Sequence, residues 1–281
     1  MMLCIIFSGP HAAGQSLQEE VCFLCDSARL GRRFGDRGVV DAAFYVQREF
    51  RQMGLKTSMC HFRSSGKVGH NVQGLLRSPG STKYIIVTAC MDGVGEYGGK
   101  VYPGADANAS GVAAMMSLAR SLRSAHPGRN ILFVGLDGHS DNCAGAQALW
   151  DNLPSLGISK SDIVMVVNLD TMGSNLAPPQ RYWKDYLIVL GGARYENSIL
   201  SCNEGLRLHL YFDYYGSRAF TDMFYRRVGD QSVFVGHGVP AVMVTSGITD
   251  NTNKPSDVPS TLSMELLERR VELVRRWILK L

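Results

Sequence analysis

One aspartate stands alone among small and polar residues in the stretch Tyr-Pro-Gly-Ala-Asp-Ala-Asn-Ala-Ser-Gly, residues 102–111. This acid is Asp106, and a run rich in Ala and Met follows it up to residue 122. The small, apolar run predicts a helix that begins in the turn. Asp106 could be a metal ligand presented by a sheet-to-helix loop, or it could be an ordinary helix cap. The choice depends on whether other ligands exist elsewhere in the chain.

Further polar residues follow apolar runs that are typical of strands. They are Cys90, Asp92, His139, Ser140, Asp141 and Asp170, while Asp230 and Gln231 stand before a short apolar segment. Asp is common at turns and helix N-termini, so for any single acid a capping role is the simpler interpretation. A cysteine after an apolar strand is typically a small buried side chain, and a histidine in a Gly/Ser/Asp loop is typically a solvated turn residue.

The elements that must position these residues are visible as alternating patterns. We expect eight strands, at residues 55–62, 71–76, 84–92, 130–138, 163–170, 186–192, 208–215 and 240–247. Helical patterns cover residues 39–53, 108–125, 144–153 and the C-terminal segment from Ser263. This alternation predicts an α/β fold, a three-layer sandwich in which helices flank a central mixed, mostly parallel sheet. Ligands of such sheets bind beyond the carboxyl ends of the strands, where the polar residues lie.

Composition excludes some classes of function. The chain has 281 residues and a formal net charge of +4, and its basic residues form short, scattered pairs such as Arg275-Arg276. Such pairs indicate solvated helix faces and no nucleic-acid surface. No run reaches the roughly 20 apolar residues of a membrane span. The Cys-x-x-Cys pair Cys22 and Cys25 stands alone on a helical pattern, which favours ordinary half-buried thiols over a zinc or redox site.

The first 14 residues have features of an export signal. An apolar run is followed by small residues at Ala12 and Gly14, which is similar to the end of a secretory signal cleaved after Gly14. The basic segment of such a signal is missing, because no Lys or Arg precedes Arg29. We expect residues 1–14 to be a signal remnant and residues 15–281 to be a single domain. The expected location is periplasmic or extracellular, and otherwise cytoplasmic.

Two motifs resemble those of one known family. Residues 103–120, Pro-Gly-Ala-Asp-Ala-Asn-Ala-Ser-Gly-Val-Ala and onward to Leu-Ala-Arg, are close to a PGADDNASGVA…LAR motif, and residues 168–173 match N-x-D-M-G. Less specific matches are residues 31–38, residues 238–242 and the terminal helix. In this order they resemble the di-zinc aminopeptidase family, which includes bacterial leucine aminopeptidases, glutamate carboxypeptidase and the glutaminyl cyclases. The resemblance covers residues 30–281 and implies a zinc-exopeptidase fold.

Carried over position by position, the resemblance implies a degenerate metal site. The bridging aspartate falls on Asp106 and the N-x-D-M-G aspartate on Asp170, so both are kept. A ligand histidine is exchanged for Cys90, while its companion outside the metal shell is kept as Asp92. The remaining positions are substituted: His139 stands at the general base, Ser140 and Asn253 at two ligands, Gln231 at a histidine that is not a ligand, and Ala107 at the second acid of the motif.

These substitutions predict a change of chemistry. Hydroxyl and amide groups are poor donors for a divalent transition ion, so the metal that Asp106, Ser140 and Asn253 would share is expected to be lost. Cys90, Asp106 and Asp170 remain acceptable zinc ligands, which gives at most one zinc ion, or none. Our leading hypothesis is an inactive or impaired peptidase whose cleft binds a peptide, a peptide terminus or another protein. The alternative is a mono-zinc hydrolase or cyclase that uses His139 as its base.

Overall fold

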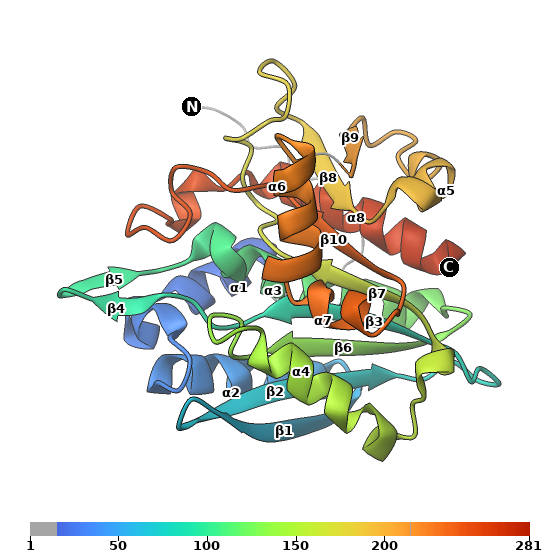
Figure 1. Cartoon of the computed structure of the whole chain (residues 1–281), viewed down its shortest axis with the longest axis horizontal. Coiled ribbons are helices and arrows are strands. Elements are labelled where there is room, and N and C mark those ends of the chain that lie inside the picture. Colours follow the sequence, from blue (N-terminus) through green and yellow to red (C-terminus); the bar gives the residue numbers. More distant parts are fainter. Residues whose placement is uncertain (1–15, 214) are drawn as a thin grey trace, which may run out of the picture.

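A single eight-stranded sheet forms the centre of the molecule in the computed structural model, which describes residues 16–213 and 215–281 (Figure 1). The strand order is β1-β2-β6-β3-β7-β10-β8-β9. The strands are β1 (Lys56–Ser64), β2 (Lys67–Leu76), β3 (Tyr84–Cys90), β6 (Asn130–Leu136), β7 (Ile163–Leu169), β8 (Tyr186–Leu190), β9 (His209–Phe212) and β10 (Ala241–Thr245). Parallel pairs join β3 to β6 and β7, β7 to β10, and β8 to β9, and the other pairs are antiparallel.

The helices cover both faces of this sheet. They are α1 (Leu17–Cys25), α2 (Arg37–Gln52), α3 (Ser110–Ala125), α4 (Ala144–Asn152), α5 (Glu196–Leu200), α6 (Arg218–Met223), α7 (Gln231–Gly236) and α8 (Met264–Lys280). In Figure 1, α4 and α7 lie in front of the sheet, and α2, α3 and α8 lie behind it. The fold is therefore the predicted three-layer sandwich around a mixed, mostly parallel sheet, and that prediction is confirmed.

Strand β3 shows why its sequence requires two covered faces. All seven of its residues are buried. Ile85 and Val87 pack into the larger core together with α2, α3 and α8, whereas Tyr84 and Ile86 pack into a second core with α4 and α7. Successive side chains of a strand point to opposite faces, so an uninterrupted apolar run is stable only when both faces are covered.

Two buried arginines fasten the loops around the carboxyl edge of the sheet. Arg32 donates hydrogen bonds to the carbonyls of Leu24, Met91, Pro103 and Gly104, at 2.6 to 3.0 Å. It thereby ties the end of α1 to the loop after β3 and to the turn before Asp106. Because one guanidinium donates to all four carbonyls, it fixes the backbone that presents the polar residues.

The second buried arginine, Arg270, holds the loop after β7. Its guanidinium donates to the carbonyls of Met172, Ser174 and Tyr186 at 2.7 to 2.9 Å. Because α8 packs behind the sheet, this contact connects the rear layer with the loop that follows Asp170. A buried guanidinium is tolerated here since several carbonyl oxygens satisfy its donors.

Segments without long periodic patterns escaped prediction. A small hairpin of β4 (Gly95–Tyr97) and β5 (Lys100–Tyr102) turns through two glycines with positive φ, Gly98 and Gly99. The short helices α5, α6 and α7 also lie in segments for which no helix was predicted. No helix of the described ranges is both long and apolar enough to span a bilayer. The predicted signal remnant lies outside the described residues, and it stays a prediction, as does the domain organisation.

Candidate functional site

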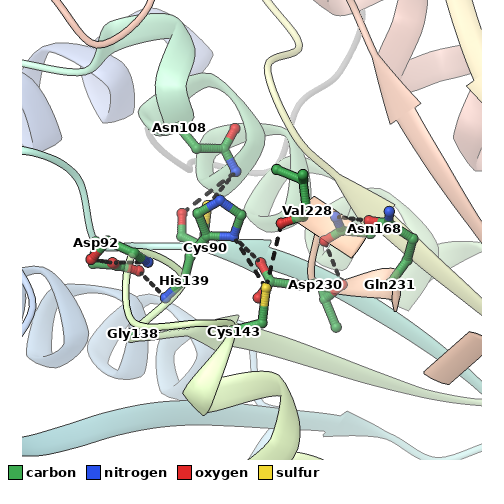
Figure 2. Close-up of polar contacts among 12 residues, drawn as sticks. Cys90, Asp92, Asn108, Gly138, His139, Cys143, Asn168, Val228, Asp230 and Gln231 are labelled. Atoms are coloured by element: carbon green, nitrogen blue, oxygen red, sulfur yellow. Dashed lines mark hydrogen bonds and ion pairs between the residues drawn. The ribbon is translucent and has the colours of Figure 1, made fainter. Parts of the chain in front are cut away.

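The polar residues of the strand ends meet at the carboxyl edge of β3, β6 and β7. Cys90 is the last residue of β3, His139 follows the end of β6, and Asp170 follows β7 directly. Asp230 comes from a different part of the chain and directly precedes α7. Figure 2 shows Cys90, His139 and Asp230 converging, with Asp92 on one side and Gln231 on the other.

Cys90, His139 and Asp230 form the tightest cluster of ligand-type side chains. One ligand atom of each lies within 4.8 Å of those of the other two. The His139 Nδ1 atom is 3.1 Å from Asp230 Oδ2. Asp230 is only 1% exposed, and its Oδ1 atom has no hydrogen-bond partner within the described residues. No other group of three such side chains in the described part of the chain brings its ligand atoms equally close.

Asp92 fixes the loop that carries His139. Its Oδ1 atom accepts the backbone N–H of His139 at 2.9 Å, and its Oδ2 atom accepts the N–H and the hydroxyl of Ser140 at 3.0 and 2.8 Å. Both carboxylate oxygens are therefore used within the protein. Burial raises the pKa of Asp92, while the charge of His139 and these hydrogen bonds oppose the rise. The side chain of Ser140, a predicted degenerate ligand position, points at Asp92.

Asn108 gives Cys90 a hydrogen-bond donor. Its Oδ1 atom accepts the backbone N–H groups of Gly111 and Thr171 at 3.2 and 2.9 Å, which fixes the orientation of the amide. The Nδ2 atom consequently points the other way, toward Leu169 O at 2.9 Å and Cys90 Sγ at 3.4 Å. A donor aimed at sulfur favours the thiolate form of a cysteine.

Burial and charge act together on the central groups. Burial raises the pKa of the Cys90 thiol well above its usual value. For His139, burial alone lowers the pKa, but the nearby charges of Asp230 and Cys90 outweigh it and raise the pKa well above the usual range. Burial also raises the pKa of Asp170, with the positive charge of His139 opposing the rise. His139 is thus held as the cationic partner of Asp230 when both are ionised.

Asp106 is engaged by the protein itself. Its Oδ1 atom accepts the N–H groups of Gly173 and Ser174 at 2.8 and 3.2 Å and lies 3.1 Å from the hydroxyl of Ser110. Its Oδ2 atom accepts the hydroxyl of Ser246 at 3.3 Å. Burial raises the pKa of this carboxyl to about 6, against the effect of the backbone hydrogen bonds. Asp106 therefore connects the turn before α3 with the loops after β7 and β10.

The predicted metal set of Cys90, Asp106 and Asp170 is not the set that the structure brings together. Asp170 lies in the electrostatic neighbourhood of His139 and Asp230, but it does not join the cluster of three, and roles for Asp106 and Asp170 as ligands stay predictions. Asn253 lies exposed on the loop after β10 with a positive φ of 59°. It is not a member of the cluster either.

Asp230 is the member that sequence reasoning left without a role. The family resemblance assigns a position to its neighbour Gln231, in place of a histidine, and none to Asp230. The structure uses Gln231 to position this segment, because its Oε1 accepts from Asn168 at 2.9 Å and its Nε2 donates to Phe224 O and Tyr225 O. The sequence marks Asp230 only as an acid between an Arg-Arg-Val-Gly stretch and a short apolar run. That pattern is too common to identify a ligand.

An apolar pocket of about 400 Å³ lies between the loop after β7 and the segment that begins at Tyr215. It is lined by Ala177, Pro178, Pro179, Ile188, Tyr215, Gly216, Phe220 and Ile248. Burial, with smaller contributions from the charges of Asp170 and Asp106, raises the pKa of Tyr215 to about 12, so the pocket is within electrostatic reach of both acids. The hydroxyl of Tyr215 accepts the backbone N–H of Ile248. Tyr182, in the loop between β7 and β8, is 86% exposed and does not line this pocket.

Solved structures define the class of fold. The chain is similar to BSAP, a zinc aminopeptidase from Bacillus subtilis, with a TM-score of 0.76 and 13% identity over 94% of each chain. It is also similar to a glutaminyl cyclase from Fimbriiglobus ruber, with a TM-score of 0.74, 17% identity and coverage of 94% of this chain and 93% of the other. The fold is thus that of the zinc exopeptidases.

The chain belongs to peptidase family M28, whose model matches residues 71–278. The family resemblance seen in the sequence is therefore confirmed. A curated relative, the alkaline phosphatase isozyme conversion protein of Escherichia coli strain K12, is 26% identical over 163 residues, which is 50% of this chain and 47% of the relative. The match thus spans about half the length of that protein.

The residues present do not suit the two zinc ions that the family resemblance implies. Asp106 is occupied by four protein donors, and Ala107 has no donor atom to replace it. The hydroxyl of Ser140 is bonded to Asp92, and Asn253 offers an exposed amide. Zinc ligands in proteins are thiolate, imidazole and carboxylate groups, so the second ion would lack a shell. We therefore derive no hydrolytic step through a pair of metal ions.

Proposed function

We propose that this M28 family member binds the amino-terminal end of a peptide and does not hydrolyse it. The proposal rests on the hydrogen bonds that two buried acids of the site, Asp92 and Asp106, make within the protein. Both carboxylate oxygens of Asp92 and of Asp106 accept hydrogen bonds from other groups of the protein. Neither is free to hold a metal or to move a proton. Two-metal hydrolysis needs attacking and leaving oxygens clamped together, and these groups no longer supply that clamp.

The state of His139 supports the same proposal. It occupies the general-base position of the family, and its Nδ1 atom is bonded to Asp230 at 3.1 Å. An imidazole whose pKa is raised by neighbouring charges holds its proton near neutral pH and is then unable to accept another. The same raised pKa argues against the alternative of a mono-zinc hydrolase in which His139 acts as the free base.

The proposed ligand follows from what remains free in the cleft. Asp170 makes no side-chain hydrogen bond or ion pair with the described residues, and its surroundings are partly exposed. A peptide ammonium group would satisfy this carboxylate by a charge-assisted hydrogen bond. The nearby pocket between Tyr215, Phe220 and Ile248 suits an apolar side chain. A peptide with a free amino terminus and an apolar first residue would engage both.

The test measures binding of short peptides by isothermal titration calorimetry. We expect tripeptides that begin with Leu, Met or Phe to bind, and N-acetylated versions to bind at least about tenfold more weakly, because a charge-assisted hydrogen bond contributes about 1.5 kcal/mol or more. Asp170→Asn should reduce affinity for the free peptides only, and Tyr215→Ala should reduce it for both. Tyr182→Ala, which removes an exposed aromatic outside the pocket, is the control. Equal binding of free and acetylated peptides, or no binding of any, would contradict the proposal.

A further inference from the structure

We propose that Cys90, His139 and Asp230 together bind one divalent transition-metal ion, with zinc as the best match, through a ligand set that differs from the one implied by the family resemblance. The three residues supply thiolate sulfur, imidazole nitrogen and carboxylate oxygen, the three donor types that zinc uses in proteins. This inference concerns the metal alone and holds whether or not the cleft binds peptides.

The distances are those of a site that needs only small side-chain adjustments. One ligand atom from each residue lies within 4.8 Å of the other two, and His139 Nδ1 and Asp230 Oδ2 are 3.1 Å apart. Ligand atoms that share a tetrahedral zinc are about 3.3 to 3.8 Å apart, given metal–ligand bonds of about 2.0 to 2.3 Å. The ligand atoms of the cluster therefore need to move by only about 1 Å to enclose an ion.

Asp230 gives an independent sign of a missing partner. The residue is 1% exposed, and its Oδ1 atom is buried without a hydrogen bond from the described residues. A buried carboxylate oxygen without a donor costs free energy, and native proteins rarely leave one in that state. In Figure 2 this carboxylate lies beside the His139 ring, near the sulfur of Cys143. A metal ion between the three side chains would complete its coordination.

Hydrogen bonds from surrounding residues fix the three proposed ligands or their neighbours in place, as they do around the ligands of known metal sites. Asn108 donates to Cys90 Sγ at 3.4 Å, and its amide cannot flip because its Oδ1 accepts two backbone N–H groups. Asp92 fixes the backbone of His139 at 2.9 Å. Gln231, next to Asp230, is fixed by Asn168 at 2.9 Å. Such outer contacts orient ligands and raise metal affinity.

Cys143 is the obvious competitor for the thiolate position. Its Sγ atom is 4.0 Å from His139 Nδ1, but its thiol donates to the carbonyl of Val228 at 3.5 Å. It is not a member of the group whose ligand atoms all lie within 4.8 Å. A thiol that donates to a carbonyl is protonated and is not a metal ligand. We therefore assign the thiolate to Cys90, which leaves one coordination position of a tetrahedral ion open.

The experiment loads the metal-free full chain with cobalt(II) or zinc. Cobalt is the spectroscopic probe, because a thiolate ligand gives a near-ultraviolet charge-transfer band. We expect one ion per chain, the thiolate band, and a rise in Tm on zinc addition. Cys90→Ser should remove the band, and Cys90→Ser and Asp230→Asn should each weaken binding at least about 100-fold, since even loss of an outer contact costs 10- to 100-fold.

Three matched variants make the assignment specific. Cys143→Ser, Cys202→Ser and Asp170→Asn should keep both the band and the stoichiometry. Thermal unfolding of each variant without metal shows whether it is folded, and the Tm rise on zinc addition is then compared with that of the parent chain. Absence of bound metal, retention of binding in Asp230→Asn, or transfer of the effect to Cys143 or Asp170 would overturn the proposal. Retained peptide binding without bound metal would refute the metal site while leaving the proposed function intact.

Discussion

The imidazole of His139 and the carboxylate of Asp230 are 91 positions apart in the sequence and lie 3.1 Å apart in the fold. This pair forms part of the candidate metal site. It joins the loop after β6 to the start of α7 and brings His139 and Asp230 together with Cys90.

Asp106→Asn should destabilise the protein without removing its metal site. An amide cannot accept all four hydrogen bonds that the carboxylate receives from Gly173, Ser174, Ser110 and Ser246. We expect a loss of about 2 to 3 kcal/mol in the free energy of unfolding, measured in urea. Asp250→Asn, at an exposed acid of the loop after β10, is the control and should change little. Unaltered stability of Asp106→Asn would show that the carboxylate is not structural.

Arg32→Lys should loosen the carboxyl edge of the sheet. The guanidinium bonds to four carbonyls from three segments, and an ammonium group cannot reach them all. We expect a loss of about 2 to 4 kcal/mol in the free energy of unfolding. The adjacent Arg33 is exposed, so Arg33→Lys is a control at the next position. A loss of similar size in both variants would count against a specific role for Arg32.

Glu20 should make stability depend on pH between about 4.5 and 7. Burial raises the pKa of this carboxyl from 4.5 to about 7 in the folded protein, although Arg120 lies 2.7 Å away and opposes the rise. Because the folded state holds the proton more tightly, the contribution to stability is full below pH 4.5 and is lost as pH rises through 7. The loss is up to about 3 kcal/mol.

Glu20→Gln isolates this effect. The difference in unfolding free energy between parent and variant should move in favour of the variant as pH rises from 4.5 to 7. Glu268→Gln, at an exposed position of α8, should give a difference that stays flat over the same range. A parent-minus-variant difference that does not change with pH would show that Arg120 fully offsets the cost of burial.

Asp92→Asn should weaken the metal site without abolishing it. Asp92 contacts the backbone of His139 and Ser140, so it acts through the loop and not on the ion. We expect a 10- to 100-fold higher Kd for zinc by competition with a chromophoric chelator, with an unchanged thiolate band of cobalt. Complete loss of binding in a folded variant would make Asp92 a ligand, and an unchanged Kd would make the loop contact unimportant.

Sequence patterns predicted the sheet because its strands are buried on both faces. Runs such as residues 84–90 and 130–136 are mostly apolar segments, and each forms a strand. The helices with several turns of periodic apolar residues, α2, α3 and α8, were predicted for the same reason. The helices of five or six residues between Glu196 and Gly236 carry less than two turns of pattern and escaped prediction.

The arrangement of the candidate site was harder to predict from the sequence than the sheet. The topology of parallel strands indicated that Cys90, His139 and Asp170 lie at one edge of the sheet. The partners of Asp106 are backbone N–H groups of Gly173 and Ser174, and no side-chain pattern encodes them. Asp230 precedes a short helix after an irregular segment, so its meeting with His139 depends on tertiary packing alone.

The most direct test of the central claim is hydrolysis of leucine p-nitroanilide by the full chain, after zinc loading and after EDTA treatment. We predict no release of nitroaniline above the protein-free control in either state, because the proposed function leaves the site without a free base and without a second metal ion. Release that requires zinc, that EDTA abolishes and that His139→Ala depresses would contradict it.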